Sequence, residues 1–115
     1  MFFAFIRTAA LVADDFPLYA HLITLDEPGS EIARRDFKAA KTGGSKERYQ
    51  FAVGLTTFLG NNRAMGLQIP GVTEEMLDQT TEAVIKLLQG IRSDAAVANH
   101  VEYLLDYLGG PTNAN

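Results

Sequence analysis

The most regular pattern of apolar and polar positions lies between Thr73 and Leu108. Apolar residues recur there at steps of one, three and four, which is the spacing of one face of an α-helix. We predict two helices: the first begins after Thr73, a good N-cap residue, and the second begins after Ser93. Gly90 is predicted to lie just past the end of the first helix. Because the link is short, the two helices are expected to form an antiparallel hairpin.

The middle of the chain carries two further helical patterns. Residues 45–59 are apolar on nearly all sides after the first turn, which is typical of a central helix covered by others. The Gly43–Gly44 pair precedes that helix, and Ser45 is its predicted cap. Residues 31–41 are mostly polar and predict a surface helix capped by Ser30. The sequence therefore predicts one outer and one central helix here.

The N-terminal third is less regular. Asp14–Asp15 can cap a helix that has Pro17 in its first turn, and residues 26–29 predict a turn. Residues 2–13 are largely apolar, and they fit either a helix or a strand, with the helical pattern downstream favouring a helix. Since Arg7 interrupts this run and no basic residue precedes it, we expect no secretory signal peptide. No run approaches the ~20 apolar residues of a membrane span.

Composition limits the size and class of the fold. The chain has 115 residues, 47% of them hydrophobic and 21% charged, which is typical of one globular domain. We place that domain at residues 1–110 and expect a disordered tail at 111–115. The absence of cysteine excludes disulfides and thiolate metal sites and fits a cytoplasmic location. The predicted fold is all-α: a compact bundle of five or six short helices with a C-terminal antiparallel αα-hairpin.

Charge is distributed unevenly along the chain, although the net charge is only −4. Residues 34–48 hold six basic and two acidic side chains, and residues 74–106 hold seven acidic and two basic ones. The basic segment consists of Arg34, Arg35, Lys38, Lys41, Lys46 and Arg48. The acidic face assigned to the predicted hairpin consists of Glu74, Glu75, Asp78, Glu82, Glu102 and Asp106. Either set could bind a partner of opposite charge.

No catalytic, cofactor-binding or metal-binding signature is present, and we assign no residue to those roles. His21 lies among leucines and is expected to be a packed or rim residue. His100 and Glu102 are two positions apart, so they face different sides of a helix and make a poor metal pair. The glycine-containing segment 41–46 lacks the frame of a phosphate-binding loop, although the helix start that follows it could hold an anion.

The favoured function is a small acidic helical interaction module. It would act as an inhibitor, immunity or assembly factor that docks on a basic partner or on a second copy of itself. Tyr103 and Tyr107 are four residues apart and would form an aromatic anchor if exposed, or a core edge if packed on the N-terminal helices. Two alternatives are a small-molecule-binding or enzymatic bundle, and a nucleic-acid-binding domain that uses the basic segment 34–48.

Overall fold

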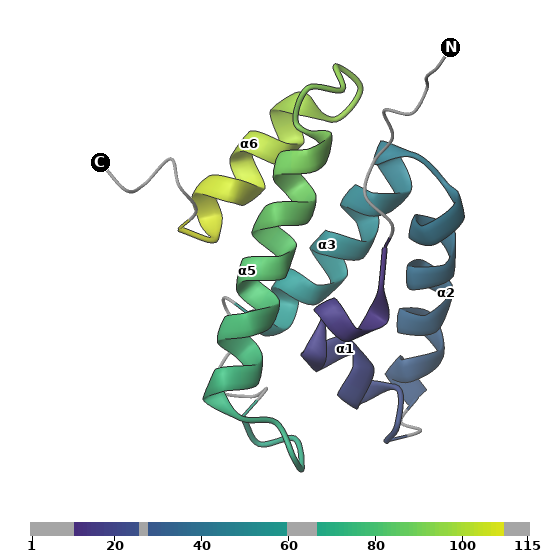
Figure 1. The fold of residues 1–115 in the computed structure, drawn as a ribbon, viewed down its shortest axis with the longest axis vertical. Helices are drawn as coiled ribbons and strands as arrows, with labels where there is room; N and C mark the ends of the chain where they lie inside the picture. Colours follow the sequence, from purple (N-terminus) through teal and green to yellow (C-terminus); the bar gives the residue numbers. More distant parts are fainter. Residues whose placement is uncertain (1–10, 26–27, 60–66, 110–115) are drawn as a thin grey trace.

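The computed structural model describes residues 11–25, 28–59 and 67–109, and all regular structure in these ranges is helical (Figure 1). The elements are a 3₁₀ turn η1 (Ala13–Asp15) and the helices α1 (Pro17–Leu22), α2 (Pro28–Thr42), α3 (Ser45–Leu59), α5 (Glu74–Ile91) and α6 (Ala98–Tyr107). The predicted all-α fold is confirmed. The predicted tail at 111–115 and the choice between helix and strand for residues 2–10 lie outside the described residues.

The helices follow one another across the molecule in the order α2, α3, α5, α6. Helix α3 packs against α2 on one side and α5 on the other, while α6 packs against the C-terminal half of α5 (Figure 1). The short helix α1 and the η1 turn also lie against α5. The predicted central position of the helix at 45–59 is confirmed. Its apolar pattern on nearly all sides is explained by neighbours on two opposite faces.

Four aromatic rings form one half of the core, and Phe51 is in contact with the other three. Its ring centroid lies 5.2 Å from that of Phe16, 5.5 Å from that of Tyr19 and 5.4 Å from that of Phe37, all in edge-to-face arrangements. Tyr19 and Phe37 stack on each other at 4.8 Å. Burial raises the pKa of the Tyr19 phenol, and the positive charge of Arg34 opposes that shift. The cluster thus ties α1 and α2 to α3.

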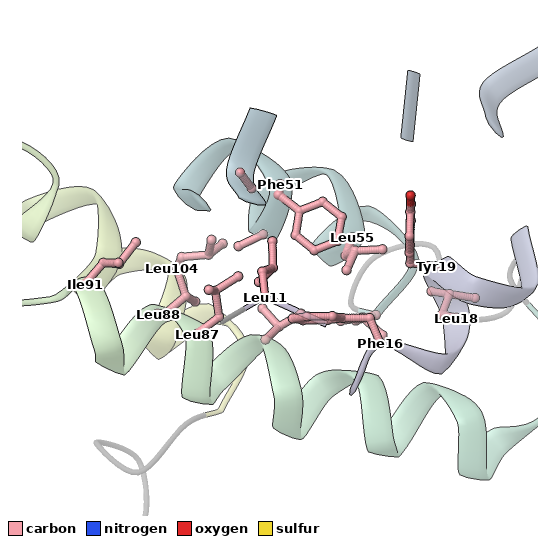
Figure 2. Close-up of a cluster of buried hydrophobic side chains, with 14 of the residues drawn as sticks. Leu11, Phe16, Leu18, Tyr19, Phe51, Leu55, Leu87, Leu88, Ile91 and Leu104 are labelled. Atoms are coloured by element: carbon pink, nitrogen blue, oxygen red, sulfur yellow. The ribbon is translucent and has the colours of Figure 1, made fainter. Parts of the chain in front are cut away.

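The other half of the core is aliphatic and joins α3, α5 and α6. Figure 2 shows Leu87, Leu88, Ile91 and Leu104 gathered beside Leu11, close to the aromatic rings. Leu88 is fully buried and Ile91 is 3% exposed. The apolar stripe predicted for the C-terminal helices therefore faces the interior.

The start of α5 and the end of α6 lie where the sequence predicts them, but the end of α5 and the start of α6 do not. The Thr73 cap is confirmed, because its hydroxyl accepts a hydrogen bond of 3.1 Å from the Met76 N–H. Gly90, however, lies inside α5, which continues to Ile91 and so buries that side chain. Ser93 caps no helix. Instead the Asp94 carboxylate accepts a hydrogen bond of 3.0 Å from the Ala96 N–H, and α6 starts only at Ala98 and ends at Tyr107.

Helix starts in the first half of the chain were also predicted one to three residues away from their true positions. Asp14 and Asp15 form the η1 turn, and α1 begins after Phe16 with Pro17 as its first residue. Helix α2 begins at Pro28, because proline suits a first helical position, and Ser30 lies buried inside the helix. The predicted turn at 26–29 is therefore wrong at its last two residues; the first two lie outside the described residues.

The start of α3 is capped by a side chain within its first turn. The Gly44 N–H donates a hydrogen bond of 2.8 Å to the Glu47 carboxylate, which lowers the pKa of Glu47. Ser45 is the first helical residue and not the cap. Its hydroxyl instead donates to Asp94, so this helix start is tied to the turn before α6.

The hydrogen bond between Ser45 and Asp94 leads to a testable prediction about the pKa of Asp94. Hydrogen bonds from the Ser45 hydroxyl and then from the Ala96 N–H lower the pKa of Asp94. Their stabilising effect is present above the ordinary aspartate pKa and is lost as pH falls through the lowered folded-state value. In Ser45→Ala we expect the pKa of Asp94 to rise toward its ordinary value in a carboxyl-carbon NMR titration. The pKa of Glu47, set first by Gly44, should stay unchanged; an Asp94 titration identical in both proteins would contradict the assignment.

Two glycines should respond in opposite directions to replacement by alanine. Gly71 has a φ of 88°, and an added Cβ would lie 2.5 Å from the His21 ring, so Gly71→Ala should cost about 1–3 kcal/mol. Gly90 has no atom within 4 Å of an added Cβ and lies inside α5, so Gly90→Ala should stabilise by about 0.5–1 kcal/mol. Urea denaturation would measure both. A destabilised Gly90→Ala would instead support the sequence-based view that Gly90 ends the helix.

Candidate functional site

Two tyrosines stand out on the exposed side of α6. Tyr103 is 75% exposed and Tyr107 is 42% exposed, and they lie one helical turn apart. The opposite side of the helix buries Val101, Leu104 and Leu105. Of the two interpretations that the sequence left open, the structure supports exposure and not core packing. The exposure of Tyr103 could have been predicted from the sequence, because the apolar stripe at 101, 104 and 105 leaves position 103 on the opposite face of the helix.

We define the α6 surface as the exposed residues Asn99, Tyr103, Asp106 and Tyr107. Its electrostatic character is negative. Asp106 lies beside both tyrosines, and the last turn of α6 contains no basic residue to balance the partial negative charge of a helix C-terminus. The surface thus combines aromatic area with a carboxylate.

Two contacts hold α6 in place. Arg92 donates two hydrogen bonds of 2.9 Å to the Glu102 carboxylate, which anchors the first half of the helix to the preceding turn. The rings of His100 and Tyr49 meet edge-to-face at 5.7 Å, which connects α6 to α3. These two contacts fix the helix that carries the exposed tyrosines. Binding a partner would therefore cost little conformational entropy.

The residues of the predicted acidic face belong to two helices. Glu74, Glu75 and Asp78 are exposed in the first turns of α5. Glu102 is half-buried and paired with Arg92, and Glu82 lines a groove that also contains a basic side chain from α3. Only Asp106 lies among the exposed tyrosines of α6.

The basic segment is also divided by the fold. Arg35, Lys38 and Lys41 are exposed on α2, and Lys46 is exposed at the start of α3. Arg34 is exposed, but its guanidinium donates a hydrogen bond of 2.6 Å to the Ile23 carbonyl at the end of α1.

Arg48 does not belong to an exposed basic surface, because only 7% of it is exposed. It lies on the same stripe of α3 as Ala52, Leu55 and Leu59, all of which are buried. That spacing of four, three and four residues was visible in the sequence and predicts an inward position. From the sequence alone, Arg48 is instead placed in the exposed basic segment because its side chain is charged.

A groove of about 380 Å³ lies where the start of the described chain meets α3 and α5. Leu11, Phe16 and Leu87 form part of its apolar lining. Its charged lining is of both signs and consists of Asp15, Arg48, Glu82 and Lys86. Its size lies within the range of small-molecule pockets, which are about 300–1,000 Å³.

His21 has a structural role. Its Nε2 lies 2.6 Å from the Pro70 carbonyl, which fixes that nitrogen as the donor, and its ring covers Gly71. The side chain therefore closes the turn before α5 onto α1. Over the ranges 11–25, 28–59 and 67–109, no group of three or more histidine or carboxylate side chains could hold a metal ion.

The helices of the described chain include none with the length and apolar character needed to cross a membrane. In comparisons with known proteins, no family model, curated protein or solved structure matches this chain.

Proposed function

We propose that this protein is an interaction module whose α6 surface docks on a basic surface of a protein partner. The observation that carries the proposal is the exposure of Tyr103, at 75%, beside Tyr107 on a helix whose opposite face is buried. Tyrosine supplies a large contact area at low conformational cost and is enriched among residues that dominate binding energy. An inhibitor, immunity or assembly factor would use such a surface.

The chemistry of the α6 surface favours a cationic partner. Asp106 and the C-terminus of α6, whose last turn contains no basic residue, attract positive charge, and a tyrosine ring face can hold an arginine or lysine head group. The nucleic-acid alternative has less support, since the acidic α6 surface would repel phosphates and the buried Arg48 removes one cation from the basic segment.

The proposal can be tested by photocrosslinking in cells that produce the protein. A benzophenone amino acid replacing Tyr103 should trap a protein adduct, while the same group replacing Gln68, exposed in the turn before α5, should not. The trapped protein is then purified, and its Kd is measured with wild type and with Tyr103→Ala. We expect Kd to rise at least about tenfold. Equal trapping at both positions, or an unchanged Kd, would refute docking through α6.

The groove supports a second candidate, the binding of a small zwitterionic molecule. Its lining offers cations and carboxylates next to apolar side chains, which suits a free amino acid. A thermal-shift series with free amino acids would test this, because a ligand at 100 times its Kd stabilises by about 2.7 kcal/mol. Glu82→Gln, exposed in the groove, should reduce the shift while Glu75→Gln, outside it, should not. No stabilisation by any member of the series would remove this candidate.

A further inference from the structure

We propose that the partner of the α6 surface is helix α2 of a second copy, so that molecules associate head to tail. This inference rests on the proposed function and names its partner. We define the α2 face as Ile32, Arg35, Lys38 and Ala39, all of them exposed. Each copy would present the α6 surface to one neighbour and the α2 face to another.

The α2 face has the composition of a docking site. Its four residues follow at steps of three, three and one, which places them together on the side of α2 that faces away from the buried Ser30 and the half-buried Phe37. Ile32 is 55% exposed and adds a large apolar side chain to this face. Arg35 and Lys38 form no ion pair with any described residue. The face therefore offers two cations and an apolar side chain.

The α6 surface and the α2 face complement each other in charge and in the types of side chain that they expose. Asp106 and the negative end of α6 would face Arg35 and Lys38, whose charges have no intramolecular partner in the described chain. The exposed ring of Tyr103 would cover Ile32, and its face can also accept the guanidinium of Arg35. Neither surface complements itself, since one is acidic and aromatic while the other is basic and aliphatic.

The position of the two surfaces determines the kind of assembly. Helix α2 packs against α3, α6 packs against α5, and α3 and α5 lie between them, so the two surfaces are at opposite edges of the molecule (Figure 1). One contact between two copies leaves an α2 face free on one and an α6 surface free on the other. Such a heterologous contact continues into a chain or a ring and does not stop at a twofold dimer.

Sedimentation velocity of the full-length protein would test this. Wild type at low salt should form species larger than a dimer as concentration rises toward about 1 mM. These species should dissociate as salt is raised, because exposed charges are screened over about 10 Å at 0.1 M. The α6 variant, Tyr103→Ala with Tyr107→Ala, and the α2 variant, Arg35→Glu with Lys38→Glu, should each be monomeric. Circular dichroism would establish that both variants remain helical.

Mixing the two variants provides the sharper test. The α6 variant keeps its α2 face and the α2 variant keeps its α6 surface, so an equimolar mixture should form one heterodimer and nothing larger. Lys46→Glu with Lys86→Glu changes the net charge equally at exposed positions outside the α2 face and should assemble like wild type.

Three results would overturn the inference: a wild type that is monomeric at every concentration, an α2 variant that still associates, or a mixture that gives no heterodimer. If photocrosslinking at position 103 still traps a different protein in that case, the proposed function stands and only the identity of the partner is wrong. If position 103 traps nothing, the proposed function fails together with this inference.

Discussion

Replacing Phe51 with alanine should cost about 3–5 kcal/mol of unfolding free energy, the usual loss for a buried phenylalanine. The side chain is 2% exposed and touches the rings of Phe16, Tyr19 and Phe37, so its removal leaves a cavity where three elements meet. Domains of this size are stable by roughly 5–15 kcal/mol, so the variant would lose a large share of its stability. Urea denaturation followed by circular dichroism would measure the loss.

Val53 provides the matched control for Phe51. It lies two positions along the same helix but is 37% exposed, so Val53→Ala should change the unfolding free energy by less than about 0.5 kcal/mol. Similar losses in both variants would mean that the aromatic cluster makes no special contribution to stability in this part of α3.

The second large effect is expected at Thr80, which is fully buried in α5. Its hydroxyl accepts a hydrogen bond of 3.0 Å from the Leu18 N–H, in the first turn of α1, so a residue of α5 caps a helix 62 positions earlier in the chain. Thr80→Val keeps the shape and leaves that N–H without an acceptor in the core. We expect a loss of about 1–3 kcal/mol and faster exchange of the Leu18 amide hydrogen.

Two substitutions separate the hydrogen bond from other effects at this position. Thr80→Ser keeps the hydroxyl and should retain slow exchange at Leu18, although it loses a methyl group. Thr81→Val removes a hydroxyl that only donates to the Leu77 carbonyl of its own helix, and it should cost less than Thr80→Val. Normal protection of the Leu18 amide in Thr80→Val would contradict the capping role.

Elements with a strong local signal were predictable from the sequence. Thr73 followed by acidic residues is a local cap, and the structure contains it. The apolar pattern of residues 45–59 has one physical explanation, coverage on several sides, and α3 is covered by α2 and α5. In both cases the information lies within a few residues or within one helix.

The errors occurred where contacts from distant parts of the chain decide the outcome. Gly90 inside a helix and a glycine just past a helix look alike in the sequence, and α5 continues because Ile91 gains burial. Ser93 and Asp94 are equally good caps by residue type, and Asp94 forms the turn because it has support from Ser45, 49 positions earlier. The groove could not be predicted, since its lining comes from segments that only the fold brings together.

The cap that Thr80 provides for α1 also has a consequence for synthesis on the ribosome. A helix of six residues is too short to persist alone, and the acceptor for its Leu18 N–H is made 62 residues later. At about 5–20 residues per second, that delay is roughly 3–12 s. During this interval the nascent chain exposes Phe16, Leu18 and Tyr19, which are buried in the finished protein. Helix α1 is therefore made before the other described helices but is among the last of them to become stable.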